Sequence, residues 1–185
     1  MAESTVVSQL YDTYSQAAAA VKDLEISGVA SSQISLIANN SDQEMTGAGA
    51  GATAGALAGG GAGLLAGLGM LAVPGIGPVV AAGWLAATAL GAAAGATAGG
   101  VVGALVDSGV SNDDAELFAE SLRRGGTLVT VRCNAPDEDK VTAILHARNP
   151  VDVSVRKRLY RDEGWTGFDD QAQPYRPIER DRPGA

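Results

Sequence analysis

The alternation of apolar and polar positions predicts a strand, a helix and a second strand near the start of the chain. Residues 5–10 are rich in β-branched side chains and predict the first strand. A helix capped by Asp12 or Thr13 follows and ends at Gly28. Its expected buried face carries Ala17, Ala20, Val21 and Leu24. Residues 34–38 predict the second strand, and residues 39–42 a polar turn.

Similar patterns return after residue 107. Ser111 and Asp114 resemble a capping box at the start of a helix that ends at residues 125–126. Residues 127–133 alternate and predict a strand, and Pro136 opens another helix. Residues 151–156 again alternate and predict a half-buried fourth strand. The order predicts an α+β fold: a ferredoxin-like βαβ(α)βαβ domain made of residues 4–44 and 107–156, with a four-stranded antiparallel sheet.

The segment between the two halves, residues 45–106, contains no charged residue and 18 of the 25 glycines, so its pattern differs from the rest of the chain. Its small residues keep i, i+4 spacing, which on a helix places them on one face and lets two backbones approach closely. We therefore expect these positions to pack helices together: Gly47, Gly51, Gly55, Gly59, Gly63, Gly67, Gly83, Ala87, Gly91, Gly95, Gly99 and Gly103.

Between the two glycine series, Pro74, Gly75, Gly77 and Pro78 predict a reversal of the chain. Residues 45–106 are thus expected to form a helical hairpin, with arms at about 47–73 and 79–106 and the turn at 74–78. The large apolar side chains gather around the turn, at residues 64–90. Such a tip can cross or re-enter a bilayer, but the Gly-rich arm bases gain little from insertion. The alternative is that the hairpins bury one another without lipid.

The last segment, residues 157–185, shows no sustained periodicity and is expected to be disordered. Within it, residues 164–169 include Trp165 and Phe168 and form a candidate docking motif for the body of the protein or for a protein partner.

Charge and residue counts exclude several kinds of chemistry. A net charge of −8 and a pI near 4.5 argue against nucleic-acid binding, because nothing neutralises phosphates. The single cysteine, Cys133, and single histidine, His146, exclude a disulfide and a Cys/His zinc cluster. The run Gly59–Gly63 lacks the lysine of a phosphate-binding loop. We therefore predict no catalytic, cofactor-binding or metal-binding residues, and no enzyme activity.

One run of residues resembles a known family. Gly109-Val110-Ser111, Asp113-Asp114-Ala115-Glu116 and Arg124-Gly125-Gly126-Thr127-Leu128-Val129-Thr130-Val131 are similar to the bacterial general stress protein (heat-induced stress protein) domain. The resemblance covers residues 4–156 and implies a stress-linked role in a bacterium. The family has no agreed catalytic motif, so the resemblance assigns no functional residue.

The sequence thus predicts a non-enzymatic bacterial stress-response protein that forms homo-oligomers through the glycine stripes of its hairpin. The expected location is the cytoplasmic side of the inner membrane, with the lipid bilayer as a partner. The alternative is a soluble cytoplasmic homo-oligomeric scaffold or shell-like assembly.

Overall fold

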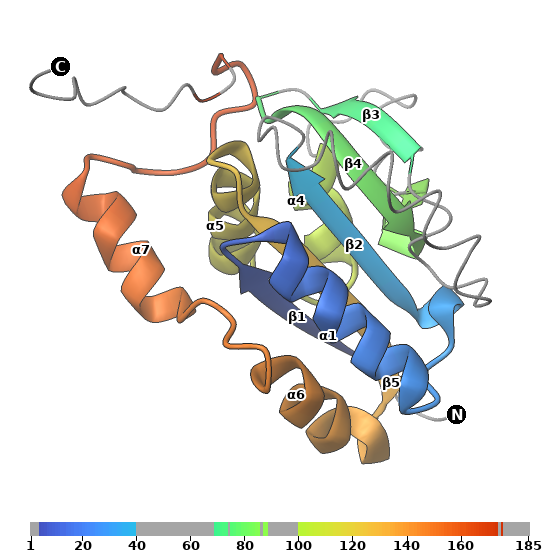
Figure 1. The fold of residues 1–185 in the computed structure, drawn as a ribbon. Coiled ribbons are helices and arrows are strands. Elements are labelled where there is room, and N and C mark those ends of the chain that lie inside the picture. Colours follow the sequence, from blue (N-terminus) through green and yellow to red (C-terminus); the bar gives the residue numbers. More distant parts are fainter. Residues whose placement is uncertain are drawn as a thin grey trace, which may run out of the picture.

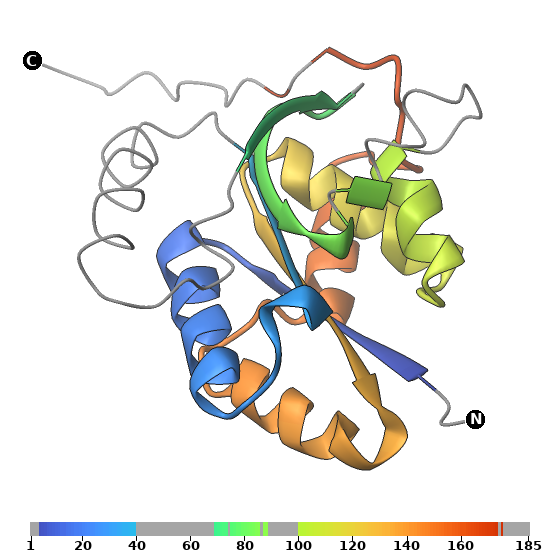
Figure 2. The same ribbon diagram turned by 90° about the vertical axis from the view of Figure 1, so that its right-hand side faces the viewer.

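The computed structural model describes residues 4–39, 69–73, 75–85, 87–88, 100–173 and 175. Within them an antiparallel five-stranded sheet carries helices on both faces (Figures 1 and 2). The elements, in chain order, are β1 Ser4–Tyr11, α1 Tyr14–Ile26, η1 Ser31–Gln33, β2 Ile34–Asn39, β3 Gly69–Val73, β4 Gly77–Gly83, α4 Gly100–Asp107, α5 Asn112–Arg123, β5 Thr127–Asn134, η3 Ala135–Asp137, α6 Glu138–His146 and α7 Val153–Asp162. This mixed architecture confirms the α+β class.

The sheet has the order β1-β5-β2-β4-β3, and each neighbouring pair is antiparallel. β5 therefore lies between β1 and β2, which run parallel to each other and are joined through α1. This half agrees with the predicted ferredoxin-like arrangement. The other half differs from that arrangement. The described residues contain no strand on the outer side of β1, where a ferredoxin-like fold has its fourth strand, and β4 and β3 extend the sheet beyond β2 instead. The ferredoxin-like topology is therefore not confirmed.

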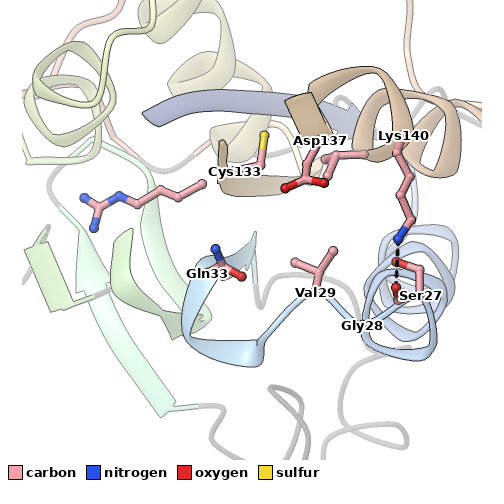
Figure 3. A pocket seen from close by; sticks show the side chains of 9 residues that line it. Ser27, Gly28, Val29, Gln33, Cys133, Asp137 and Lys140 are labelled. Atoms are coloured by element: carbon pink, nitrogen blue, oxygen red, sulfur yellow. Dashed lines mark hydrogen bonds between the residues drawn. The ribbon is translucent and has the colours of Figure 1, made fainter. Parts of the chain in front are cut away.

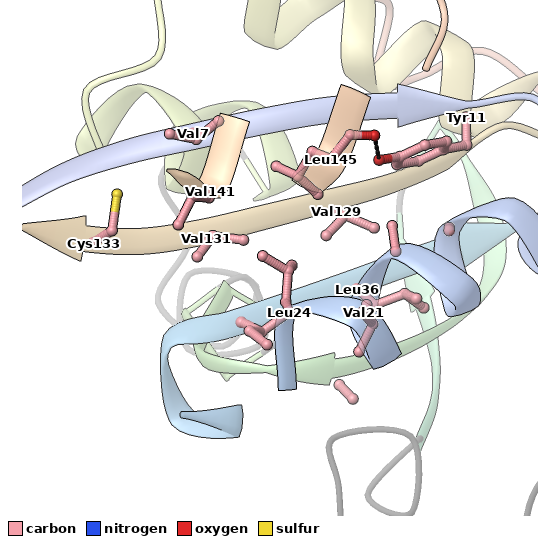
Figure 4. Close-up of a cluster of buried hydrophobic side chains, with 14 of the residues drawn as sticks. Val7, Tyr11, Val21, Leu24, Leu36, Val129, Val131, Cys133, Val141 and Leu145 are labelled. Atoms are coloured by element: carbon pink, nitrogen blue, oxygen red, sulfur yellow. Dashed lines mark hydrogen bonds between the residues drawn. The ribbon is translucent and has the colours of Figure 1, made fainter. Parts of the chain in front are cut away.

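Each face of the sheet has its own hydrophobic core. Helices α1 and α6 cover one face, where Val21, Leu24 and Leu145 pack against Leu36 and Val131 (Figure 4). The hydroxyl of the buried Tyr11 side chain donates to the Leu145 carbonyl at 2.9 Å and ties α6 to β1. Helices α4 and α5 cover the opposite face. The apolar positions that the sequence assigns to the faces of α1 and α5 are the ones that the structure buries.

The prediction of helical arms is wrong for residues 69–73 and 79–83, which are strands in β3 and β4. The predicted chain reversal does occur: Ile76 N–H donates to the Val73 carbonyl at 3.1 Å, and Gly75 and Gly77 have φ of +74° and +101°. The turn therefore joins two strands. The physical reason lies in β2, which is buried throughout and needs hydrogen-bond partners on both edges; β4 supplies one of them.

The fourth predicted strand, residues 151–156, is also wrong, because α7 begins at Val153. The Asp152 carboxylate accepts a hydrogen bond from Val155 N–H at 2.9 Å and caps this helix. The same helix corrects the expectation of disorder from residue 157, since residues 157–162 belong to α7. In the second predicted arm, residues 84–85 and 87–88 are helical and residues 100–106 belong to α4, as predicted. Residues 47–68, 86 and 89–99 of the predicted arms lie outside the described residues.

Candidate functional site

A small pocket lies between the end of α1, the end of β5 and the start of α6 (Figure 3). Its volume is about 100 Å³, which is well below the several hundred Å³ typical of small-molecule sites. Its lining residues are Ser27, Gly28, Val29, Gln33, Arg132, Cys133, Asp137, Lys140 and Val141. The Lys140 ammonium already donates to the Ser27 carbonyl at 2.9 Å, so it joins the two helices across the pocket.

The chemistry of this pocket is set mainly by Cys133. Burial raises the pKa of the Cys133 thiol, and the nearby Glu138 and Asp137 carboxylates raise the pKa further. Because the thiolate is the nucleophilic form, the raised pKa makes this thiol less reactive than an exposed one. The Cys133 side chain lies in the core on the α1 side, where it packs as a small apolar residue. The pocket therefore presents no activated cysteine nucleophile.

A second cluster surrounds the end of α5, and we name it the Glu120 cluster. The Glu120 side chain is only 2% exposed and accepts hydrogen bonds from Arg123 at 2.7 Å and from Arg124 at 2.6 Å. Arg124 also pairs with Glu163, and its guanidinium lies 4.0 Å from the ring centroid of Tyr160. A buried carboxylate between two guanidiniums needs all its partners, because removing one leaves an uncompensated charge. The cluster therefore fixes α7 against α5.

The residues after α7 also pack on the body of the protein. The backbone N–H of Trp165 donates to the Tyr160 carbonyl at 2.9 Å, and the Trp165 and Tyr160 rings meet edge to face with their centroids 6.3 Å apart. Phe168 N–H lies 3.4 Å from a Glu116 carboxylate oxygen. The Asp169 carbonyl approaches the β3–β4 turn, where a Cβ on Gly75 would lie only 2.7 Å away. The candidate docking motif thus contacts α5, α7 and the turn of the β-hairpin.

Of the predicted helix-packing residues, the structure describes Gly83, Ala87 and Gly103, and they do not lie on one helix. Gly83 ends β4 with φ of +91°, so it lies in the sheet. Ala87 is exposed, and Gly103 lies on α4, where an added Cβ would have no neighbouring heavy atom within 4 Å. The turn residues Gly75 and Gly77 flank Ile76, whereas Pro78 is the second residue of β4. The other predicted packing glycines, and Pro74, lie outside the described residues.

The polar residues at the start of α5 have structural partners. Asp114 N–H donates to the Ser111 hydroxyl at 3.2 Å, which confirms Ser111 as the N-cap. The Asp114 carboxylate accepts from the Ser111 hydroxyl at 2.8 Å rather than from the Ser111 backbone N–H, so the reciprocal bond of a capping box is not among the hydrogen bonds of the described residues. Asp113 pairs with Lys157 and Arg161 of α7. Within the described ranges, no group of three or more His, Cys, Asp or Glu side chains is placed to hold a metal ion.

The Glu120 cluster does not emerge from the sequence as a unit. Sequence reasoning places Glu120 on a solvated acidic face and treats Arg123 and Arg124 as charges that complement the helix dipole. The available signal is the spacing: Glu120 lies three and four residues before the two arginines, so all three share one helix face. That this face is covered depends on residues distant in the chain, among them Tyr160 and Glu163, which contact Arg124.

Comparison with protein-family models gave no matching family, and comparisons with curated proteins and with solved structures gave no similar protein. The resemblance to the general stress protein domain thus remains a hypothesis that rests on the residues named above. In the part of the chain that the structure describes, no helix combines the length and the apolar character needed to cross a membrane.

Proposed function

We propose that this chain is a non-enzymatic, self-associating bacterial stress-response protein, in which an α+β domain carries Gly/Ala-rich segments that bury one another without lipid. The observation that carries the proposal is the position of the apolar residues around the Pro-Gly turn. On the membrane hypothesis these side chains lead insertion into the bilayer, so their burial inside the domain favours the alternative.

Several of those side chains belong to the core on the α4 and α5 face. Ile76 is 1% exposed, Val79 and Leu85 are fully buried, and Val73 is 7% exposed. Nearby, the Trp84 indole donates to the Gln33 carbonyl at 3.2 Å, and the Arg132 guanidinium lies 3.4 Å from the Trp84 ring centroid. Each fully buried Leu, Ile or Val side chain contributes roughly 1.5–3 kcal/mol to folding. Removing this group from the core would therefore cost several kcal/mol.

The first part of the uncharged segment offers little in compensation. Residues 45–63 contain Gly, Ala and Thr with Met45 and Leu57 as the only large apolar side chains. Even Leu contributes only about 0.3–0.6 kcal/mol to membrane insertion, so these residues are poor insertion sequences. Their i, i+4 small-residue spacing remains suited to close backbone packing between segments. The stress-response assignment rests on the family resemblance.

The test separates self-association from lipid binding. The full chain is mixed with anionic phospholipid vesicles and floated on a density gradient, and its mass without lipid is measured by light scattering after size-exclusion chromatography. We expect a defined oligomer that stays at the bottom of the gradient. The double variant Gly55→Leu with Gly95→Leu should lower the mass, while Ala143→Leu, at an exposed position of α6, should not.

Each contrary result has a distinct meaning. Flotation with the vesicles would contradict the lipid-free assembly and restore the membrane hypothesis. An oligomer of unchanged mass in the double glycine variant would remove the role of the Gly/Ala segments. A monomer at every concentration would overturn self-association altogether.

A further inference from the structure

The outer edge of β1 is open along much of its length. β1 pairs with β5 on one side from Ser4↔Asn134 to Tyr11↔Thr127. On the other side, Val151 N–H donates to the Leu10 carbonyl at 2.7 Å. Backbone groups of successive strand residues point to alternate edges, so Ser4, Val6 and Ser8 also face outward. Among the described residues, no backbone group pairs with Val6 or Ser8 on this edge.

This edge lacks the features that usually prevent strand addition. β1 contains no charged residue and no proline, and its register with β5 runs without a bulge. The sequence-predicted strand at 151–156 would have covered this edge. Because α7 begins at Val153 instead, only the Leu10 end is occupied. The remaining edge can accept an extended strand through backbone hydrogen bonds.

We propose that the occupant is β1 of a second copy of this chain, paired antiparallel about a two-fold axis at Val6. The inference rests on the proposed self-association and adds to it an interface outside the Gly/Ala segments. In this register Ser4 of one copy lies opposite Ser8 of the other, and the two Val6 residues face each other. Leu10 is already bonded to Val151, so Ser4, Val6 and Ser8 are the outward residues that remain. A two-fold pairing centred on Val6 uses all three.

The charges around β1 favour a second copy over an unrelated strand. At the Tyr11 end, Arg156 of α7 pairs with Asp12, and Lys157 and Arg161 pair with Asp113, so the exposed Arg158 is the basic residue of α7 that has no ion pair among the described residues. At the opposite end, β5 leads into three exposed acidic residues that form no ion pair among the described residues: Asp137, Glu138 and Asp139. Antiparallel pairing brings Arg158 at the Tyr11 end of one copy toward these acidic residues of the other, twice in each dimer.

Helix α7 also contributes apolar surface on this side of the molecule. Tyr160 is buried toward α5, whereas Val155 and Leu159, one turn apart, are 52% and 49% exposed. Figure 1 shows α7 beyond the end of β1, on the side away from β3. A second copy at the β1 edge would lie beside this helix and could cover the two side chains.

The experiment introduces opposite charges at the axis. Val6→Lys and Val6→Glu are made in the full chain, with Ile26→Lys as the control, since Ile26 is 75% exposed at the end of α1. Mass is measured by sedimentation velocity. Each Val6 variant alone should weaken edge pairing roughly tenfold or more, because like charges meet across the axis. An equimolar mixture should restore the original mass as a heterodimer, and Ile26→Lys should leave the mass unchanged.

Hydrogen exchange on the unmodified chain gives a second test that needs no substitution. The Ser8 amide should exchange more slowly as protein concentration rises, whereas the Val7 and Gln9 amides, which face β5, should be protected at all concentrations. An exchange rate at Ser8 that does not depend on concentration would overturn the proposal.

The two proposals fail differently. In the Gly55→Leu and Gly95→Leu variant we expect a dimer that Val6→Lys converts to a monomer. If Val6→Lys leaves the mass of every assembly unchanged, or if the Lys and Glu variants do not recombine, the edge interface is wrong while self-association through the Gly/Ala segments stands. A wild-type chain that is monomeric throughout would overturn both.

Discussion

Replacing Gly83 with alanine distinguishes the strand that the structure shows from the helix that the glycine spacing predicts. Gly83 ends β4 and pairs with Ser35. Its φ is +91°, and a Cβ at this position would lie 2.1 Å from the Ile34 carbonyl oxygen and 2.8 Å from the Ser35 Cα. Both contacts are with the backbone of β2, so no side chain can rotate away to make room.

The expected cost follows from these two features. The left-handed conformation costs an L-residue about 1–2 kcal/mol. Relieving the Cβ contact requires a backbone shift that weakens the end of the β2–β4 ladder, at about 0.5–1.5 kcal/mol for each hydrogen bond lost. We therefore expect Gly83→Ala to lower the free energy of unfolding by about 3 kcal/mol, or the Tm by roughly 6–12 °C. A Gly→Ala change inside a helix would instead stabilise it by roughly 0.5–1 kcal/mol.

Gly103 provides a matched control within the same predicted glycine series. It lies inside α4, and its added Cβ would meet no heavy atom within 4 Å. Gly103→Ala should therefore raise the free energy of unfolding by about 0.5–1 kcal/mol. Both variants are unfolded in urea at one fixed protein concentration, because self-association makes stability concentration-dependent. Far-UV circular dichroism reports the transition.

The described structure predicts that Gly83→Ala lowers the free energy of unfolding and that Gly103→Ala raises it. The helical hypothesis places both glycines on helices and predicts that both substitutions raise it. If Gly83→Ala is as stable as the unmodified chain or more stable, residues 77–83 do not form the strand described, and the helical arm is restored. If Gly103→Ala is strongly destabilising, another part of the chain covers α4 at that position.

Three further outcomes test the remaining structure. Glu120→Ala should lower the free energy of unfolding by about 3 kcal/mol in urea titrations, because it leaves Arg123 and Arg124 without their buried partner. The control Glu163→Gln changes a half-exposed carboxylate and should lower it by less than about 1 kcal/mol. Equal losses of stability in the two variants would contradict the central role of Glu120. Trp165→Ala should accelerate chymotryptic cleavage after Phe168, followed by mass spectrometry. Trp165→Phe should not, because the buried Trp165 Nε1 has no acceptor among the described residues. Because folding raises the pKa of Cys133, the thiol ionises at lower pH in the unfolded chain, so the free energy of unfolding should fall as pH rises above about 8.5. Cys133→Ala should reduce this dependence of stability on pH in urea titrations. Rapid reaction of the folded thiol with a disulfide reagent at pH 7 would show that it is not buried.

Local chemistry is enough to predict α1 and α5. In α5 the Ser111 N-cap and the apolar positions Ala115 and Leu122 mark its start and its buried face, and both hold in the structure. Thr13 caps α1, and its hydroxyl accepts from Gln16 N–H at 3.3 Å. These features depend on residues within about one turn of each other, so they can be found without knowing the fold.

The segments around residues 69–83 and 151–162 cannot be assigned in the same way. Val151, Val153 and Val155 alternate as in a strand, but Asp152 caps a helix that also carries Leu159 at i, i+4 from Val155. Both periods are present, and the contacts of α7 with Asp113 and Arg124 select the helix. The pocket beside Cys133 and the Glu120 cluster likewise join residues distant in the chain, so spacing alone does not reveal them.

Interactions between residues close together in the chain account for the features that sequence patterns predict correctly: the α+β class, the helix caps and the chain reversal at residues 74–78. Long-range packing accounts for the rest. It makes this reversal join β3 to β4, puts α7 in place of a fourth strand and buries Glu120. Each of these outcomes depends on which distant element satisfies the backbone of a buried strand or the charge of a buried side chain, and residues near in sequence do not settle that choice.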